Sequence, residues 1–281
     1  MIPDRKIDNG RRTDKKTTLR LRSLDEMRDS LAWAIANDRN DSSVSGSESF
    51  TETKSADEYL SMLRDGWQEG IEGVEELDGL STDRAEKICF ERSPGGAFPV
   101  VPAYLAGAPD SMLRPVPQQA DSVRGLTLVI DSSFNCMVNA KDCKEYAHSV
   151  MRLLAWLQAE QIETAVYSVI TIADGSMRML YAVPIREAGD IMQPERIAAV
   201  VHPSFLRRAW FAQVEREYHE HQLPGTGMCT GGYGYPQTAT TEELKQALPD
   251  SYSVILLPKV GDGDPEKAVR ETITLKLRHE E

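Results

Sequence analysis

The second half of the chain alternates short apolar runs with stretches of helical periodicity. The apolar run 126–130 predicts a buried strand, and the apolar positions that follow at three- and four-residue spacing predict a helix over 141–158. The Asp174-Gly175 pair lies between two further apolar runs, 164–172 and 177–183, a pattern typical of a β-hairpin. Three helices, a strand and a final helix are expected after the hairpin, in the order 194–201, 203–219, 241–248, 253–257 and 266–278.

This order of elements predicts an α/β fold with a Rossmann-like layered sheet over residues 122–281. The first and the last strand are apolar throughout, as expected when helices cover both faces of a sheet. The sequence contains no internal repeat, so we expect one such domain.

The first half predicts a helical and irregular extension over residues 23–121. Ser23 and Ser55 each precede an apolar stripe and are followed three residues later by a glutamate, the pattern of a capped helix start. Trp67 lies in the second stripe, which favours packing in the core over stacking on a ligand. The Pro/Gly-rich stretch 91–119 fits neither helix nor strand, and its apolar residues predict an ordered belt.

Charge is unevenly distributed along the 281 residues, whose net charge is −12. Residues 1–22 carry eight Lys and Arg against three Asp, and we expect them to form a flexible basic arm. The remainder is strongly acidic. Such a body disfavours nucleic-acid binding except through the arm, because that binding depends on neutralising phosphates.

The lack of targeting segments and the pattern of cysteines indicate the cellular compartment. No apolar run reaches the roughly 20 residues of a membrane span, and the N-terminus lacks the apolar segment of a signal peptide. The four cysteines are scattered and form no close pair, which favours reduced thiols and argues against a zinc site. We therefore expect a cytoplasmic protein without a membrane contact.

Three polar segments follow predicted strands or helices and are candidates for a binding site. They are the stretch 131–135 after the first strand, the glycine-rich loop 225–232, and the Gly-Asp-Gly-Asp stretch 261–264. In an open α/β sheet, ligands collect beyond the carboxyl ends of the strands, so we expect these segments to lie near one another. Asp, Ser, Asn and Gly are also the usual residues of turns, and that interpretation stays open.

This arrangement resembles a von Willebrand factor A domain. That family has an Asp-x-Ser-x-Ser motif after its first strand, then an antiparallel hairpin, a threonine loop and an aspartate-glycine loop. Asp131 and Ser133 match the first motif, whereas Asn135 stands where the second serine is expected. The resemblance covers about residues 122–281. It implies that oxygen-bearing side chains bind one divalent cation, often Mg²⁺, and that a carboxylate of a partner protein completes the coordination.

The candidate metal ligands that this resemblance implies come from all three segments. Thr226 and Thr230 are alternatives for the threonine, and Asp262 and Asp264 are alternatives for the aspartate of the last segment. The full set of candidates is Asp131, Ser133, Asn135, Thr226, Thr230, Asp262 and Asp264.

A second resemblance concerns the first half of the chain. The Gly-Trp-x-x-Gly segment 66–70 and the Pro-x-x-Leu-x-Gly-x-Pro segment 102–109 are similar to segments of an uncharacterised family of phage-encoded proteins. The resemblance implies a phage or prophage origin and a location in the host cytoplasm. It implies no activity.

The common enzyme motifs are absent from the sequence. The glycine loop lacks the Gly-Lys-Ser/Thr of a Walker A loop and does not join a first strand to its helix as a Rossmann fingerprint does. His219 and His221 are two residues apart, whereas the zinc motif needs a spacing of four. Neither Ser132 nor Ser133 lies in a Gly-x-Ser-x-Gly elbow.

Three functional hypotheses remain. The first is a noncatalytic phage-encoded module that binds a protein partner, with a divalent cation at the strand tips. The second is a Mg²⁺-dependent hydrolase or nucleotide-acting enzyme that uses Asp131, Asp262 and Asp264. The third is a structural virion component. The first is favoured because the enzyme motifs are missing.

Overall fold

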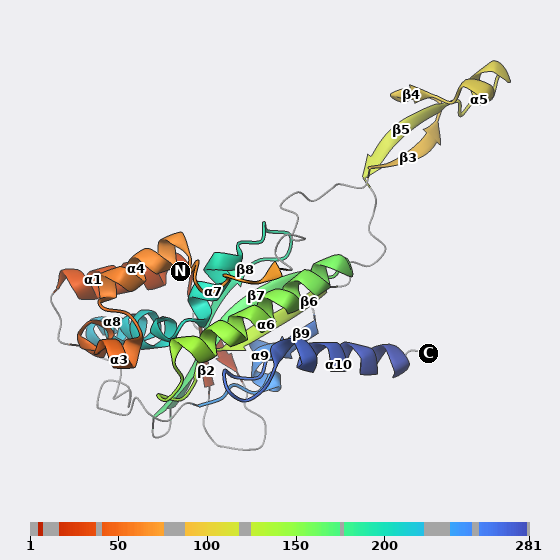
Figure 1. Cartoon of the computed structure of the whole chain (residues 1–281). Helices are drawn as coiled ribbons and strands as arrows, with labels where there is room; N and C mark the ends of the chain where they lie inside the picture. Colours follow the sequence, from red (N-terminus) through yellow and green to blue (C-terminus); the bar gives the residue numbers. More distant parts are fainter. Residues whose placement is uncertain are drawn as a thin grey trace. The chain divides into compact units, whose positions relative to one another are not determined.

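The computed structural model describes residues 5–7, 17–37, 41–75, 88–117, 125–174, 177–221, 237–248 and 253–279. The chain divides into two compact units (Figure 1). The larger unit comprises Met1–Leu80 together with Arg124–Glu281, and the smaller one comprises Ser81–Val123.

The larger unit is built on a six-stranded sheet with the order β1-β2-β8-β7-β6-β9 (Figure 1). The pairs β2–β8, β6–β7 and β6–β9 are parallel, and β1–β2 and β7–β8 are antiparallel. The strands are β1 (Arg5–Ile7), β2 (Thr17–Leu21), β6 (Gly125–Asp131), β7 (Glu163–Asp174), β8 (Met177–Arg186) and β9 (Ser253–Leu256). This sheet confirms the expected Rossmann-like layered α/β fold.

Helices flank the sheet and carry most of the remaining described residues. They are α1 (Leu24–Ala36), α2 (Ser42–Ser45), α3 (Glu48–Thr51), α4 (Ala56–Asp65), α6 (Ala140–Ala159), α7 (Pro194–Val201), the π-helical segment η3 (Phe205–Trp210), α8 (Phe211–His221), α9 (Thr241–Ala247) and α10 (Pro265–His279).

Apolar side chains cover both faces of the sheet, as predicted from its apolar strands. On one face Leu128 and Ile130 of β6 share a large core with α6, α7 and η3. On the other face Val129 shares a smaller core with Leu180 and with Leu244 of α9. The alternation along β6 follows from the two-residue period of a strand, which sends successive side chains to opposite faces.

The N-terminal helices belong to the same core as the sheet. Met27 and Leu31 of α1 and Tyr59 of α4 are fully buried together with Leu128. The sequence predicted a separate region over 23–121, and its end near residue 122 matches the boundary between the two units, whereas α1 and α4 belong to the same unit as residues 124–281. Trp67 is buried in this core, as the apolar stripe predicted.

Two helices end or change at positions that the apolar pattern does not reveal. The second N-terminal helix stops at Asp65, since Gly66 adopts a φ of 90° and the Trp67 N–H donates to the Glu195 carbonyl at 2.9 Å. The predicted helix 203–219 is divided into η3 and α8.

Residues 17–21, which the sequence placed in a flexible basic arm over 1–22, form strand β2 of the sheet. Leu19 is 1% exposed in the smaller core, and Thr17 donates a hydrogen bond to Glu243 at 3.1 Å on the same face. On the opposite face Arg20 and Arg22 reach Glu217 of α8. Charge alone predicted a solvated segment because the sequence does not reveal these buried acidic partners.

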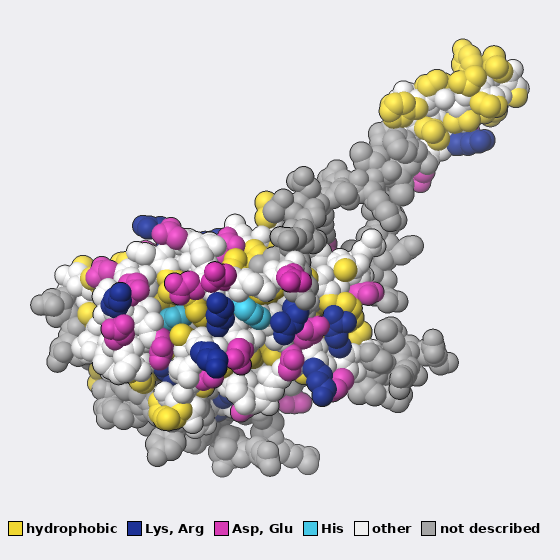
Figure 2. All heavy atoms as spheres, in the orientation of Figure 1, with side chains coloured by type: hydrophobic (Ala, Val, Ile, Leu, Met, Phe, Trp, Pro, Cys, Tyr) yellow, Lys and Arg dark blue, Asp and Glu magenta, His cyan; other side chains and the backbone are white. Residues whose placement is uncertain are grey.

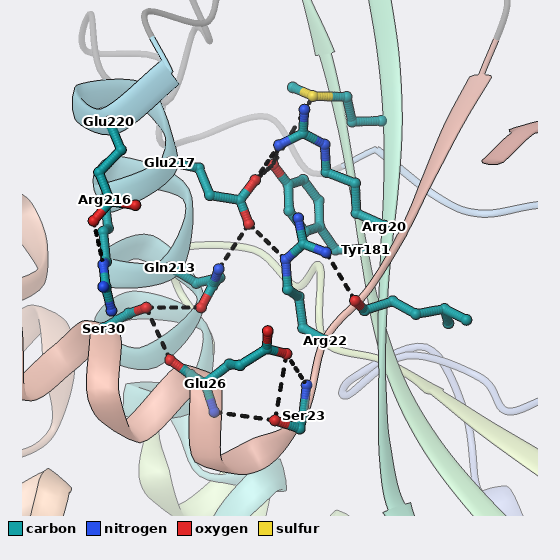
Figure 3. Close-up of polar contacts among 12 residues, drawn as sticks. Arg20, Arg22, Ser23, Glu26, Ser30, Tyr181, Gln213, Arg216, Glu217 and Glu220 are labelled. Atoms are coloured by element: carbon teal, nitrogen blue, oxygen red, sulfur yellow. Dashed lines mark hydrogen bonds and ion pairs between the residues drawn. The ribbon is translucent and has the colours of Figure 1, made fainter. Parts of the chain in front are cut away.

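Glu217 is the centre of a buried polar network (Figure 3). Its carboxylate accepts hydrogen bonds from Arg20, from Arg22 at 2.7 Å, from Tyr181 at 3.0 Å and from Gln213 at 2.7 Å. Ser30 of α1 donates to the Gln213 side chain at 2.8 Å. The network therefore joins the N-terminal strand, the sheet, α8 and α1.

The smaller unit contains a three-stranded antiparallel sheet with the order β3-β5-β4 and one short helix. Its elements are β3 (Ile88–Ser93), β4 (Phe98–Pro99), α5 (Val101–Leu105) and β5 (Met112–Pro117). The Pro/Gly-rich sequence of this unit predicts neither strand nor helix. Most of its prolines lie at element ends or in turns, where a missing N–H is tolerated. Pro115 lies inside β5 opposite Phe90 of β3, at a position that β4 does not pair with.

We predict that Glu217→Gln lowers the free energy of unfolding by about 3–5 kcal/mol, because it removes the charge of a buried carboxylate that accepts hydrogen bonds from Arg20 and Arg22. Glu220→Gln on the same helix is the matched control. The Glu220 side chain is 42% exposed and its carboxylate pairs with Arg216. Such surface pairs contribute about 0–1 kcal/mol to the free energy of unfolding. Urea unfolding of the three proteins measures both values.

The pH dependence gives a second readout for the same pair of variants. Burial raises the pKa of Glu217, but hydrogen bonds and charge from Arg22, Gln213 and Arg20 outweigh it, so the pKa lies below its usual range. Its contribution is therefore present above an ordinary glutamate pKa of about 4.3 and is lost as the pH falls below it. Equal acid sensitivity of wild type and Glu217→Gln would contradict this role.

Candidate functional site

The carboxyl end of β6 is a tightly bonded turn. Asp131, the last residue of the strand, is 2% exposed, and its Oδ1 accepts a hydrogen bond from the Ser133 N–H at 2.9 Å. The Ser132 hydroxyl lies 2.7 Å from that of Ser168, and the Ser133 Oγ accepts from the Thr171 N–H at 3.3 Å. The polar residues after the strand thus satisfy one another and the neighbouring strand β7.

Lys259 brings a positive charge to this turn from the segment after β9. Its Nζ donates to the Ser133 carbonyl at 2.8 Å and lies 3.6 Å from Asp131 Oδ2. The two side chains are 13% and 1% exposed, so the pair is largely removed from water. The parallel pairing of β9 with β6 places Lys259 here.

Burial has the largest effect on the pKa of Asp131. Desolvation raises the pKa of Asp131, and the Lys259 charge and the Ser133 hydrogen bonds offset this rise only in part. No side-chain or backbone donor within the described residues is hydrogen-bonded to Asp131 Oδ2. The Lys259 ammonium is therefore the charged group that offsets the free-energy cost of burying the Asp131 carboxylate.

The other predicted ligands have separate local roles. Asn135 is exposed, and its Oδ1 accepts from the Met137 N–H at 3.0 Å. Asp264 Oδ1 accepts from the Ser149 hydroxyl and from the Glu266 N–H at 2.9 Å, so it caps the start of α10. The Ser149 hydrogen bond is the main cause of a pKa of Asp264 below its usual range.

The remaining candidates do not complete a set of ligands. Asp262 is an exposed turn residue, and Thr226 and Thr230 lie outside the described residues. Among the residues that the structure describes, no three His, Cys, Asp or Glu side chains gather as a metal centre would require.

The donor set suits an ammonium better than a divalent cation. Mg²⁺ needs several oxygen ligands directed at one point, whereas Asn135 Oδ1 and Asp264 Oδ1 already accept hydrogen bonds from backbone N–H groups. Lys259 lies beside the carboxylate oxygen that a cation would share. The described residues therefore do not fit the implied metal, and the ligand set stays a prediction.

Arg207 of η3 binds the loop that follows β6. Its guanidinium donates to the carbonyls of Asn135 and Cys136 at 3.1 Å and of Val138 at 2.8 Å, and it also reaches the Phe50 carbonyl. Sequence reasoning missed this residue. Its one signal was a pair of arginines inside an apolar helical run, 205–211.

An open hollow lies between α1 and α4, lined by charged residues that include Arg28, Asp57 and Arg64. None of the strand-tip aspartates lines it. It therefore offers no support for chemistry at Asp131.

The smaller unit presents a second candidate surface, which we call the apolar tip. It consists of Phe98, Val101, Tyr104 and Leu105, which are 54%, 57%, 64% and 79% exposed. In Figure 2 hydrophobic side chains cover most of the visible face of this unit. Within residues 91–114, whose side chains are described, only Ser111 is buried. The unit thus has no apolar core in its described part.

The fold and the strand tip define a Rossmann-like α/β protein with a polar turn after its first central strand. The chain belongs to the family described as "Domain of unknown function (DUF7192)", whose model matches residues 6–278. No curated protein and no solved structure matches the chain. Within the described residues, none of the helices combines the length and the apolar character needed to cross a bilayer.

We predict that millimolar Mg²⁺ leaves the thermal unfolding temperature unchanged from its value in EDTA, because Lys259 already compensates Asp131. A native-state cation site at 100 times its dissociation constant would add about 2.7 kcal/mol. A Mg²⁺-dependent rise that disappears in Asp131→Ala would instead establish the metal site that the sequence resemblance implies.

Lys259→Met should lower the free energy of unfolding by about 3 kcal/mol, since it leaves a buried carboxylate without a counter-charge. In the double variant Asp131→Asn/Lys259→Met most of this loss should be recovered, because both charges are removed together. A double-mutant cycle from chemical denaturation measures the coupling. Additive effects of the two single substitutions would exclude a direct interaction.

Proposed function

We propose that this protein is a noncatalytic protein-binding module that contacts its partner through the apolar tip. The α/β body provides a rigid scaffold for the chain. The description of the family names no activity, so the proposal goes beyond it.

The observation that carries the proposal is the exposure of four large apolar side chains on one small unit. Each of them, Phe98, Val101, Tyr104 and Leu105, is more than half exposed. Scattered apolar residues are normal on a protein surface, but an exposed apolar cluster is typical of an interaction site, and residues 91–114 bury no apolar side chain. Tyrosine and phenylalanine are also enriched at the centres of protein interfaces.

The strand tip favours binding over catalysis. A metal-dependent hydrolase would need carboxylates that are free to converge on a cation and its water. Here Asp131 faces Lys259, and Asp264 caps α10. Each carboxylate therefore already has a local role, Asp131 as the partner of a buried ammonium and Asp264 as a helix cap.

The topology supports the proposal that the body is a von Willebrand A-like domain. The central strand β6 is followed by α6, then by the antiparallel hairpin β7–β8, and β9 pairs with the other edge of β6. We propose that the Lys259 ammonium takes the place of the cation in this version of the fold. The two sequence segments shared with phage-encoded proteins support a phage origin and a location in the host cytoplasm.

The test is site-specific photo-crosslinking in the cells that produce the protein. A photoreactive amino acid at Tyr104 should give protein adducts, because the apolar tip is covered by a partner. The same amino acid at Met137, which is 80% exposed on the body, is the matched control and should give few adducts. Equal yields at the two positions, or no adduct at Tyr104, would reject the proposal.

A further inference from the structure

We propose that His202 is an acid-sensitive switch: its neutral imidazole holds α4 and the segment 66–75 on α7, and protonation of the imidazole releases both from the core. The inference concerns the larger unit and does not depend on the apolar tip. It rests on the position of the ring, on the hydrogen bond that the ring accepts and on the charges around it.

His202 lies where α4, α7 and the segment after α4 meet. Its backbone N–H donates to the Ala198 carbonyl at 3.2 Å, so that His202 ends α7. The residue is 2% exposed. Its ring stacks on Tyr59 of α4 and meets Trp67 edge-on, with centroid distances of 5.8 and 4.7 Å. The imidazole therefore packs on both parts of the chain that its protonation would release.

Two further hydrogen bonds join these parts to α7. The Tyr59 hydroxyl donates to the Ala199 carbonyl at 2.8 Å, and the Trp67 N–H donates to the Glu195 carbonyl at 2.9 Å. Both acceptors belong to the helix that His202 ends. Displacement of the imidazole moves the two rings that pack on it, and it thereby disturbs both hydrogen bonds.

The hydrogen bond at Nδ1 requires a neutral imidazole. Nδ1 of His202 accepts from the Ser204 N–H at 3.1 Å, so this nitrogen carries a lone pair and the ring proton is on Nε2. A second proton binds to Nδ1, where it points at the backbone N–H. Two donors cannot form this bond, so the imidazolium must leave its site and expose the Ser204 N–H.

The groups around the ring do not compensate a positive charge. Arg207 of η3 acts on His202 and is itself a cation. From α4 and α6 come Tyr59 and Cys143, whose pKa values are raised by burial, so that both side chains are neutral. Burial and the Arg207 charge together lower the pKa of His202 to about 3.

The carboxylates of the neighbouring elements are directed elsewhere. Glu52 raises the pKa of Arg207, and Glu195 and Arg196 lie at the opposite end of α7 from His202. The acids of α4 and of the segment 66–75 are exposed, namely Asp57, Glu58, Asp65, Glu69, Glu72 and Glu75.

The direction of the pH dependence follows from the two states of the ring. An exposed histidine has a pKa of about 6.5, whereas the folded state holds His202 neutral to a much lower pH. The neutral ring therefore contributes its full stability above pH 6.5 or so, and this contribution is lost as the pH falls below that value. The equilibrium constant for release rises by up to about tenfold per pH unit in this range.

The test is hydrogen exchange of the full-length chain, measured by mass spectrometry and expressed as protection factors, from which the intrinsic pH dependence has been divided out. Between about pH 7 and about pH 5, the protection of α4 and of residues 66–75 should fall by about tenfold or more. The protection of β6 should not fall with it, because the sheet stays folded when α4 is released.

His202→Asn should abolish the pH dependence of α4, since its amide oxygen can accept from the Ser204 N–H and does not titrate. His219→Gln is the matched control. His219 is a 32% exposed histidine that lies 3.4 Å from the Asp41 carboxylate, and its replacement should leave the pH dependence of α4 intact.

The wild type alone can overturn the inference, even where a variant folds poorly. Constant protection of α4 across this pH range would exclude the switch. An equal fall in α4 and β6 would show acid unfolding of the whole unit in place of local release. A fall in α4 that persists in a folded His202→Asn protein would assign the effect to another group.

Discussion

The buried carboxylate of Glu217 is the interaction on which the arrangement of the larger unit depends. It holds two arginines of the N-terminal segment, a tyrosine of the sheet and a glutamine of its own helix at one point. Strand β2 lies at residues 17–21, far in sequence from the helix 211–221 that carries this carboxylate. Burial of an unpaired charge is so unfavourable that the strand, the sheet and the helix must come together in one geometry for the network to be satisfied.

The same principle governs the arginines of η3. Arg207 and Arg208 are almost fully buried, and their bonds go to backbone carbonyls and hydroxyls. Arg207 fixes the loop after the strand tip, and Arg208 reaches Ser43, Thr51 and Thr53 in the segment between α1 and α4. The two adjacent arginines of this π-helical segment thus both donate to carbonyl groups of other segments, Arg207 to the loop after β6 and Arg208 to residues 43–53. The N-terminal helices and the strand tip are thereby connected through one short stretch of chain.

The strand tip and the smaller unit differ in what their surfaces can do. At the strand tip, Lys259 lies beside Asp131 and donates to the Ser133 carbonyl, and Ser149 donates to Asp264. In the smaller unit, residues 91–114 bury no apolar side chain. The proposed binding surface therefore lies on that unit, and the proposed function makes no use of the aspartates at the strand tip.

The sequence by itself determined the α/β class, most of the central elements and the capped starts of α1 and α4, because these depend on local periodicity and on residues three or four positions apart. It also placed Trp67 in the core. Only the tertiary structure decided that residues 17–21 form a strand, since the partners Glu217 and Glu243 lie more than a hundred residues away. The position of Lys259 beside Asp131 likewise follows from the pairing of β9 with β6, a long-range contact that no local pattern encodes.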